Sequence, residues 1–192
     1  MLLKIFNSRY HYENYMSIDF LKDAQNLKNI YRQGWIEKLK ISSPESVGDH
    51  TYFMAIMGMI FSSKTNLNTE KILKMILIHD LAESKIGDIT PEKLPFDEKR
   101  DLENSAFFKI CQNLSKDTQL EFLELWKEFQ ENITLESKFV HQIDKLEMAF
   151  QAKIYEKSID NKDNIEIFLQ TARNSITNQK LKEILSEIEE MN

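Results

Sequence analysis

Residues 69–84 read TEKILKMILIHDLAES, and this stretch decides the fold. Its apolar residues recur every three or four positions, which predicts a helix that begins at Asn68 or Thr69 and ends close to Ser84. Asp80 falls on the apolar face of this helix, and His79 lies about 100° around the axis from it. A buried charge is costly unless it is paired or bound to a metal ion, so this interruption points to a functional site. The expected buried face consists of Ile72, Leu73, Ile76, Leu77 and Leu81.

Helical periodicity continues on both sides of this stretch. The chain has only four glycines and three prolines in 192 residues, which favours long helices and predicts an all-α, single-domain protein. Upstream, we expect a helix from Ser17 or Asp19 to about Gln33, a connector over 35–44 and a second helix over 44–63. Downstream, we expect helices over 97–114, 118–131, 135–157, 164–174 and 178–191. The stripe expected on the second helix comprises Phe53, Ile56, Met57, Ile60 and Phe61.

The composition argues against several classes of protein. A net charge of −6 and a pI near 5.3 disfavour a broad surface for nucleic acid polymers. The longest apolar stretch, Tyr52 to Phe61, is far shorter than the ~20 residues of a membrane span. The first fifteen residues show no signal-peptide pattern, and Met16 is an alternative start. The single cysteine, Cys111, cannot form an internal disulfide, so we expect a cytoplasmic protein.

Two further ligating residues interrupt apolar faces in the same way as Asp80. His50 lies three residues before Phe53, and Asp144 lies four residues after Val140. Three helices are thus expected to direct two imidazoles and two carboxylates toward one point. This mixed nitrogen and oxygen set is typical of sites for a divalent metal ion, and we expect one ion, chosen from Mn, Co, Ni, Fe, Zn and Mg.

Two acidic residues near this site are candidates for proton transfer. Glu83 lies one helical turn beyond His79, and Asp88 follows in the loop KIGDITPEKLP. Other polar residues receive ordinary structural interpretations: Asp49 in the first turn of a helix, Glu147 on the surface or as a partner behind the ligands. The residues expected to be structural or core are His11, His141, Cys111, Trp126, Phe107, Phe108, Phe122 and Phe129.

Three blocks of sequence resemble the HD-domain superfamily, and within it the bacterial 5'-deoxynucleotidases and their eukaryotic relatives. The blocks are PESVGDHTYFMAIM (44–57), ILIHDLAESKIGDITP (76–91) and HQIDKLEMAFQAKIYE (141–156). The resemblance runs from about residue 27 to 156. It implies one HD domain over 1–192, with residues 1–15 as an extension and the helices of 164–191 packed on the core.

The resemblance also implies roles for individual residues. It makes His50, His79, Asp80 and Asp144 the metal ligands, and it places Glu83 and Asp88 in the catalytic pocket. It further implies a homodimer and a deoxyribonucleoside 5'-monophosphate as substrate, cleaved to a nucleoside and phosphate.

The segment YRQGWIEKL (31–39) resembles the substrate element of the family, which would make Arg32 and Trp35 substrate-binding residues. The bacterial enzymes have Arg directly before Trp, whereas this chain has Gly34 there and Arg32 further upstream. This departure puts the phosphate contact of Arg32 and a strict preference for deoxyribose in question.

Two other functions compete with this interpretation. A two-metal phosphodiesterase or oxygenase of the same superfamily would need further histidines between Asp80 and Asp144, where the sequence has only His141. A non-enzymatic helical module that senses a nucleotide would not need Glu83 and Asp88 beside an open coordination position. A ferritin-like di-iron bundle is disfavoured because the sequence contains no Glu-x-x-His pair.

Overall fold

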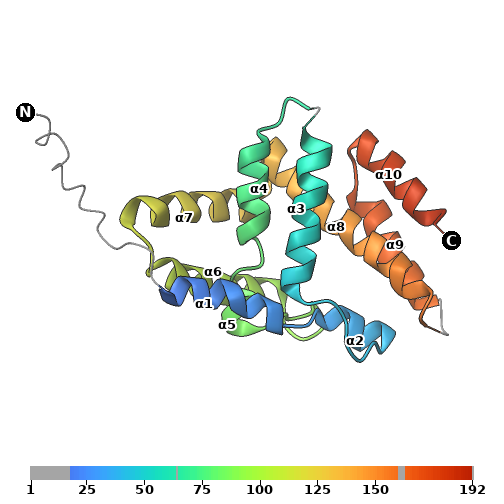
Figure 1. Cartoon of the computed structure of the whole chain (residues 1–192), viewed down its shortest axis with the longest axis horizontal. Helices are drawn as coiled ribbons and strands as arrows, with labels where there is room; N and C mark the ends of the chain where they lie inside the picture. Colours follow the sequence, from blue (N-terminus) through green and yellow to red (C-terminus); the bar gives the residue numbers. More distant parts are fainter. Residues whose placement is uncertain (1–17, 64, 160–162, 192) are drawn as a thin grey trace, which may run out of the picture.

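The computed structural model describes residues 18–63, 65–159 and 163–191, which form the helical fold drawn in Figure 1. The predicted all-α class is confirmed, because within these ranges the only extended pairing is an isolated bridge between Tyr31 and Ser46. The expected extension over 1–15, His11 and the alternative start at Met16 lie outside the described residues. The elements are α1 (Ile18–Asn26), the 3₁₀ turn η1 (Leu27–Asn29), α2 (Gln33–Leu39), α3 (Val47–Ser62), α4 (Thr69–Ile78), α5 (Glu83–Ile86), α6 (Phe96–Cys111), α7 (Lys116–Glu131), α8 (Leu135–Glu156), α9 (Asp163–Ser175) and α10 (Gln179–Glu189).

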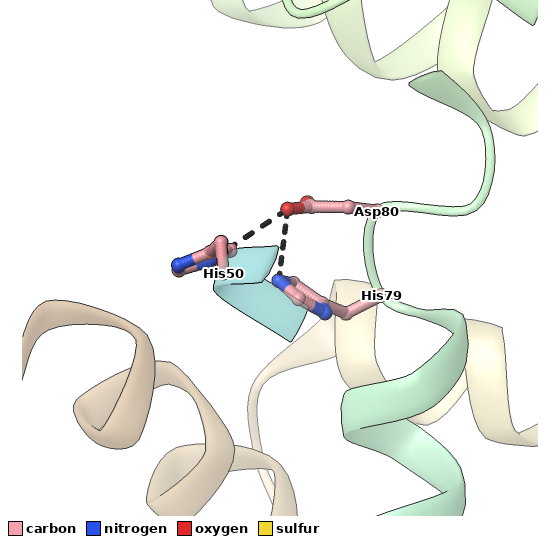
Figure 2. Close-up of side chains that lie close together, drawn as sticks. All are labelled: His50, His79 and Asp80. Carbon is pink, nitrogen blue, oxygen red and sulfur yellow. Dashed lines mark ion pairs between the residues drawn. The ribbon is translucent and has the colours of Figure 1, made fainter. Parts of the chain in front are cut away.

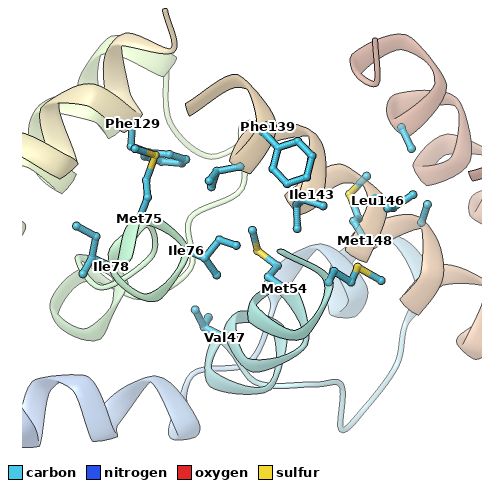
Figure 3. Close-up of a cluster of buried hydrophobic side chains, with 14 of the residues drawn as sticks. Val47, Met54, Met75, Ile76, Ile78, Phe129, Phe139, Ile143, Leu146 and Met148 are labelled. Carbon is cyan, nitrogen blue, oxygen red and sulfur yellow. The ribbon is translucent and has the colours of Figure 1, made fainter. Parts of the chain in front are cut away.

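Helix α8 lies at the centre of the packing and contacts α3, α4, α7, α9 and α10. Its side chains Val140, Ile143, Leu146 and Ala149 recur at helical spacing and have no exposed surface. Figure 3 shows Ile143 and Leu146 of α8 facing the same buried cluster as residues of α3 and α4. Burial of each large aliphatic side chain contributes about 1.5–3 kcal/mol, so this cluster fixes how the three helices are placed.

Polar caps define where the central helices begin. The Ser46 hydroxyl accepts a hydrogen bond from the Asp49 backbone N–H (3.1 Å), and the Asp49 carboxylate accepts one from the Ser46 N–H (2.9 Å). This capping box starts α3 and gives Asp49 the first-turn role expected for it. It also fixes His50 in the first turn of α3, facing the interior. The side chains of Asn68, Ser115, Thr134 and Asn178 cap α4, α7, α8 and α10.

The first helix is shorter than predicted, and the predicted connector is partly helical. Helix α1 ends at Asn26, whereas the apolar periodicity predicted a helix to about Gln33. The chain leaves the helix because the Arg32 N–H donates to the Glu45 carbonyl (3.1 Å) and the Val47 N–H donates to the Ile30 carbonyl (2.8 Å). These contacts between distant segments cannot be read from local periodicity.

The third predicted helix is also interrupted. Helix α4 ends at Ile78, residues 79–82 form a turn, and a separate short helix α5 begins at Glu83. His79 and Asp80 therefore lie at the end of α4 rather than within it. This end is where a side chain can point away from the helix axis toward a site.

Three residues expected to be buried are exposed. Leu77 is 56% exposed, Ile60 54% and Phe108 48%. Each helix has apolar residues around more than half of its circumference, so the packing partners decide which stripe is buried. On α4 that stripe contains Ile72 and Ile76. No helix in the described ranges is long and apolar enough to cross a bilayer.

Candidate metal centre

The end of α4 and the first turn of α3 bring two imidazoles and a carboxylate together. One ligating atom from each of His50, His79 and Asp80 lies within 4.8 Å of the other two. The Asp80 Oδ2 atom is 3.0 Å from Nε2 of His79 and 3.8 Å from Nε2 of His50. Figure 2 shows the two rings and the carboxylate pointing toward one another from different segments. Both imidazoles are buried.

Asp144 approaches His50 from a third segment, the middle of α8, and lies outside the group of three whose ligating atoms are all within 4.8 Å of one another. Its Oδ1 atom lies 3.4 Å from Nε2 of His50. The structure thus brings together the four residues that the sequence predicts as metal ligands, from α3, the turn after α4, and α8. His50, Asp80 and Asp144 were singled out because each interrupts an apolar face, and His79 because it stands beside Asp80.

The orientation of each ring is fixed by its other nitrogen. Nδ1 of His79 lies 2.6 Å from the Ile76 carbonyl oxygen, and Nδ1 of His50 lies 2.5 Å from Oε2 of Glu147. A proton on each Nδ1 satisfies these acceptors and leaves each Nε2 facing the acidic side chains, where it can bind a metal ion.

The atoms that face one another lack hydrogen-bond partners. Among the described residues, Nε2 of His50, Nε2 of His79 and Oδ2 of Asp80 are buried without a hydrogen bond. Buried polar atoms without a partner are costly, and a bound cation would satisfy all three. Two imidazoles and two carboxylates fit a borderline divalent metal ion.

The carboxylates of the cluster are held in their ionised form. Burial by itself raises the pKa of Asp80, but His79 and Arg32 outweigh it, and the pKa lies well below its usual range. Burial likewise raises the pKa of Asp144, and Lys145, His50 and Arg32 lower it well below its usual range. Two acids that stay ionised suit cation binding.

Arg32 lies directly on this acidic pair. Its guanidinium is 3.5 Å from Oδ2 of Asp80 and 4.0 Å from Oδ1 of Asp144. The Arg32 side chain is largely buried, and its charge remains because the neighbouring carboxylates favour it. An anionic ligand brought to the same place would find this guanidinium available for a paired contact.

Glu83 presents a buried carboxyl group to the same region. It is the first residue of α5, it is 3% exposed, and Oε2 has no hydrogen-bond partner among the described residues. Burial, with the charges of Asp80 and Asp88, raises the pKa of Glu83 well above its usual range. A raised pKa favours the protonated form of the Glu83 carboxyl, which is the form that can donate a proton.

Asp88 has a structural partner as well as a place in the site. Its Oδ2 atom accepts a hydrogen bond from the Gln33 backbone N–H (2.6 Å) and so caps the start of α2. Asp88 links the loop after α5 to the helix that carries Trp35. Sequence reasoning expected a group for proton work here and did not detect this link.

A cavity of about 350 Å³ opens beside the cluster. Its volume suits a small-molecule ligand. Trp35 forms part of its wall and packs on Phe168 of α9, with ring centroids 4.4 Å apart. The predicted substrate and catalytic residues share this cavity with the carboxylates Asp80 and Asp144, whereas His50 and His79 do not line it. The lining includes Arg32, Trp35, Asp80, Glu83, Asp88, Lys99, Asp144, Lys145 and Phe168.

Sequence reasoning missed several residues of the site. Lys99 and Phe168 reach the cavity from α6 and α9. A charged residue on an exposed helix and an aromatic residue on an amphipathic helix are ordinary in sequence, so neither stood out. For Glu147 the sequence left two interpretations, the surface or a place behind the ligands, and the structure shows the second, because Glu147 is completely buried against His50. Its position on the apolar face of α8, four residues after Ile143, is the same kind of interruption that identified Asp80 and could have decided between the two interpretations.

Glu45 lies next to Glu147 on the far side of His50. Burial, together with the Glu147 carboxylate, raises the pKa of Glu45 to about 7. Its Oε1 atom accepts a hydrogen bond from the Trp35 indole N–H (2.8 Å). Glu45 therefore connects the wall of the cavity to the group behind the metal cluster.

His141, Cys111, Trp126 and Phe107 have the structural roles expected for them. His141 is hydrogen-bonded to the Phe129 carbonyl (2.9 Å), and its ring stacks on the Phe129 ring at 4.2 Å. Burial lowers the pKa of His141. Cys111 is buried, and Trp126 stacks on Phe107.

Comparisons with known proteins agree with this geometry. A sequence model described as HD domain matches residues 24–189. The human 5'-deoxynucleotidase HDDC2 is 34% identical over 173 residues, which cover 90% of this chain and 84% of that protein. The 5'-deoxynucleotidase HDDC2 of Dictyostelium discoideum is 36% identical over 183 residues, which cover 90% of this chain and 96% of that protein. A conserved hypothetical protein from Pyrococcus furiosus superposes with a TM-score of 0.70 at 33% identity, covering 91% of this chain and 100% of that one.

Proposed function

This chain belongs to the HD domain family, and we propose that it is a metal-dependent phosphohydrolase that cleaves nucleoside 5'-monophosphates to a nucleoside and inorganic phosphate. One observation carries the proposal: two imidazole nitrogens and the Asp80 carboxylate converge beside a cavity, Asp144 lies 3.4 Å from one of the imidazoles, and three of these ligating atoms lack hydrogen bonds in the described part of the chain. The relatives that carry the name 5'-deoxynucleotidase support the substrate class.

In this proposal His50, His79, Asp80 and Asp144 hold one divalent ion, drawn from Mn, Co, Ni, Fe, Zn and Mg. A bound ion of this kind lowers the pKa of a bound water and polarises a phosphoryl group. Arg32, beside Asp80 and Asp144, would pair with the phosphate oxygens. The nearby amine of Lys99, which also lines the cavity, would add positive charge on the same side.

Glu83 is our candidate for the proton donor. Hydrolysis breaks the bond between phosphorus and the 5' oxygen, and a water oxygen takes its place on phosphorus. The leaving 5' oxygen needs a proton to depart as the alcohol of the nucleoside, and the Glu83 carboxyl, whose pKa is raised, lines the cavity. Asp88 would act through position, because its carboxylate fixes the start of α2 and with it the segment of Arg32 and Trp35.

Trp35 and Phe168 form the wall that we assign to the sugar and base. The two rings pack together at 4.4 Å, and Trp35 is held by its hydrogen bond to Glu45. A rigid aromatic wall can discriminate a ribose from a deoxyribose by the room left for the 2'-hydroxyl. We propose a preference for deoxyribonucleotides on this basis. We also propose a homodimer, which the resemblance to the 5'-deoxynucleotidases supports.

The proposal is tested by phosphate release from a panel of deoxyribo- and ribonucleoside 5'-monophosphates in the presence of Mn²⁺ or Co²⁺. The Asp80→Asn variant keeps the shape of the side chain and removes its charge, so we expect turnover to fall by more than about 100-fold. Asp97→Asn serves as the matched control, because the Asp97 side chain is 81% exposed on α6. If the wild-type chain releases no more phosphate than Asp80→Asn, the chain is a binding module and the proposal is wrong. Light scattering of the purified chain tests the homodimer.

A further inference from the structure

The two histidines of the cluster are held by different kinds of acceptor. Nδ1 of His79 faces a neutral backbone carbonyl, whereas Nδ1 of His50 faces the carboxylate of Glu147 at 2.5 Å. Glu147 has no exposed surface, so water does not screen this contact. Burying a carboxylate on the apolar face of α8 is costly unless the carboxylate is paired, and the His50 ring is the partner that it contacts.

We propose that Glu147 is a positioning residue for the metal centre: it holds the His50 ring with Nδ1 protonated and Nε2 directed toward the metal position. This inference rests on the proposed function, because it assigns a role toward the same ion. A carboxylate behind a ligating imidazole fixes the tautomer and raises the basicity of the other nitrogen, which strengthens metal binding. Glu147 itself acts only through His50.

The position of Glu147 on α8 ties it to a second ligand. Glu147 follows Asp144 by three residues, so the two carboxylates lie on neighbouring turns of one helix face. Asp144 reaches Nε2 of His50 at 3.4 Å, while Glu147 reaches Nδ1 of the same ring. Helix α8 thus contacts both ring nitrogens of His50, and a shift of the helix would move both contacts together.

The support for Glu147 continues toward the cavity wall. One carboxylate oxygen of Glu45 lies within 4.8 Å of both Glu147 and His50. Glu45 also accepts the hydrogen bond of the Trp35 indole, and the Arg32 N–H donates to its backbone carbonyl. The group behind His50 is therefore in contact with the segment that we assign to substrate binding.

A positioning role and a merely structural role make different predictions for Glu147→Gln. The amide oxygen of Gln can still accept a hydrogen bond from Nδ1, so the packing of α8 is retained. The negative charge behind the imidazole is lost. A structural role would alter the stability of the metal-free protein, whereas a positioning role alters metal affinity in a protein that remains folded.

The experiment measures Zn²⁺ affinity by competition with a chelator, without substrate, for the wild-type chain, Glu147→Gln and Glu147→Asp. Glu124→Gln, an exposed residue of α7, is the matched control for the change in charge. Circular dichroism and thermal unfolding of each metal-free variant report the folded fraction. The Nδ1 proton resonance of His50 in the Zn²⁺-loaded protein reports the contact with the carboxylate directly.

We expect Glu147→Gln to bind Zn²⁺ about 10–100-fold more weakly while remaining folded, with a shifted Nδ1 resonance. Glu147→Asp should recover part of the affinity, and Glu124→Gln should stay within about twofold of the wild type. Affinity of Glu147→Gln within twofold of the wild type, a loss that only follows the unfolded fraction, or a wild-type chain that binds no Zn²⁺ would overturn the proposal. A chain that binds Zn²⁺ in this pattern but releases no phosphate overturns the proposed function alone.

Discussion

Replacing Glu45 by glutamine should stabilise the metal-free protein at and above neutral pH and have little effect in acid. Burial and the Glu147 carboxylate raise the pKa of Glu45 from the ordinary 4.5 to about 7. The folded protein therefore holds this proton more tightly than the unfolded chain does. Glutamine is neutral at every pH, and its carbonyl oxygen can still accept the hydrogen bond from the Trp35 indole.

The sign and size of the effect follow from this difference in proton affinity. As pH rises from 4.5 to about 7, the unfolded chain releases the Glu45 proton first, so the free energy of unfolding falls across this window. The contribution is fully present below pH 4.5 and is lost above about 7. A pKa difference of this size corresponds to about 3 kcal/mol. The wild-type protein loses this stability as pH rises, whereas Glu45→Gln, with no proton to release, keeps it.

Urea unfolding in the presence of a chelator, at pH 5 and at pH 8, measures the effect. The free energy of unfolding of Glu45→Gln minus that of the wild type should grow by about 2.5 kcal/mol between the two pH values, because at pH 5 the unfolded chain has already released part of this proton. Glu124→Gln, a change of the same kind at an exposed residue of α7, controls for general charge effects. A difference that stays constant with pH, or that shrinks at pH 8, would refute the reasoning.

Three further predictions concern the metal cluster, the core and the cavity wall. Arg32→Ala removes the guanidinium that lies 3.5 Å from Asp80, so the metal-free protein should lose about 3 kcal/mol in urea unfolding and recover most of it with saturating Zn²⁺; equal losses with and without Zn²⁺ would contradict this. Gly58→Ala places a Cβ 2.5 Å from the Ile76 side chain, and this crowding should cost about 1–3 kcal/mol, more than the gain of about 1 kcal/mol from replacing a helical glycine. We therefore expect a less stable variant in urea unfolding, and a more stable one would contradict this prediction. Trp35→Phe keeps an aromatic ring against Phe168 and removes the indole N–H, and it should change the ratio of deoxyribo to ribo turnover in the phosphate-release assay; an unchanged ratio would remove Trp35 from sugar recognition.

The convergence of His50, His79, Asp80 and Asp144 was predictable because charged residues in apolar helices carry a strong physical signal. Asp80 and Asp144 stand where the periodicity calls for aliphatic side chains, and burial there is tolerable only with a partner. The same reasoning would have favoured the position behind the ligands over the surface for Glu147. It could not show that His79 and Asp80 lie at the end of a helix, because the turn over 79–82 has no glycine or proline to mark it.

The surroundings of the cluster depend on contacts between distant segments, and local pattern did not reveal them. Helix α2 exists where a connector was expected, and the Asp88 carboxylate caps it from a loop 55 residues further along the chain. Phe168 reaches the cavity from α9 because α8 and α9 pack together, although its own helix shows only ordinary amphipathic spacing. Leu77 is exposed because no helix of the described ranges packs on its side of α4. Periodicity alone does not decide which of several apolar stripes on a helix is buried.

The most direct test of the account is a crystal structure with Zn²⁺, using anomalous diffraction at the zinc absorption edge. The account predicts one peak, about 2.0–2.2 Å from Nε2 of His50, Nε2 of His79 and one carboxylate oxygen each of Asp80 and Asp144. No peak between these four side chains, or a peak bound by other residues while both Nε2 atoms stay bare, would contradict it.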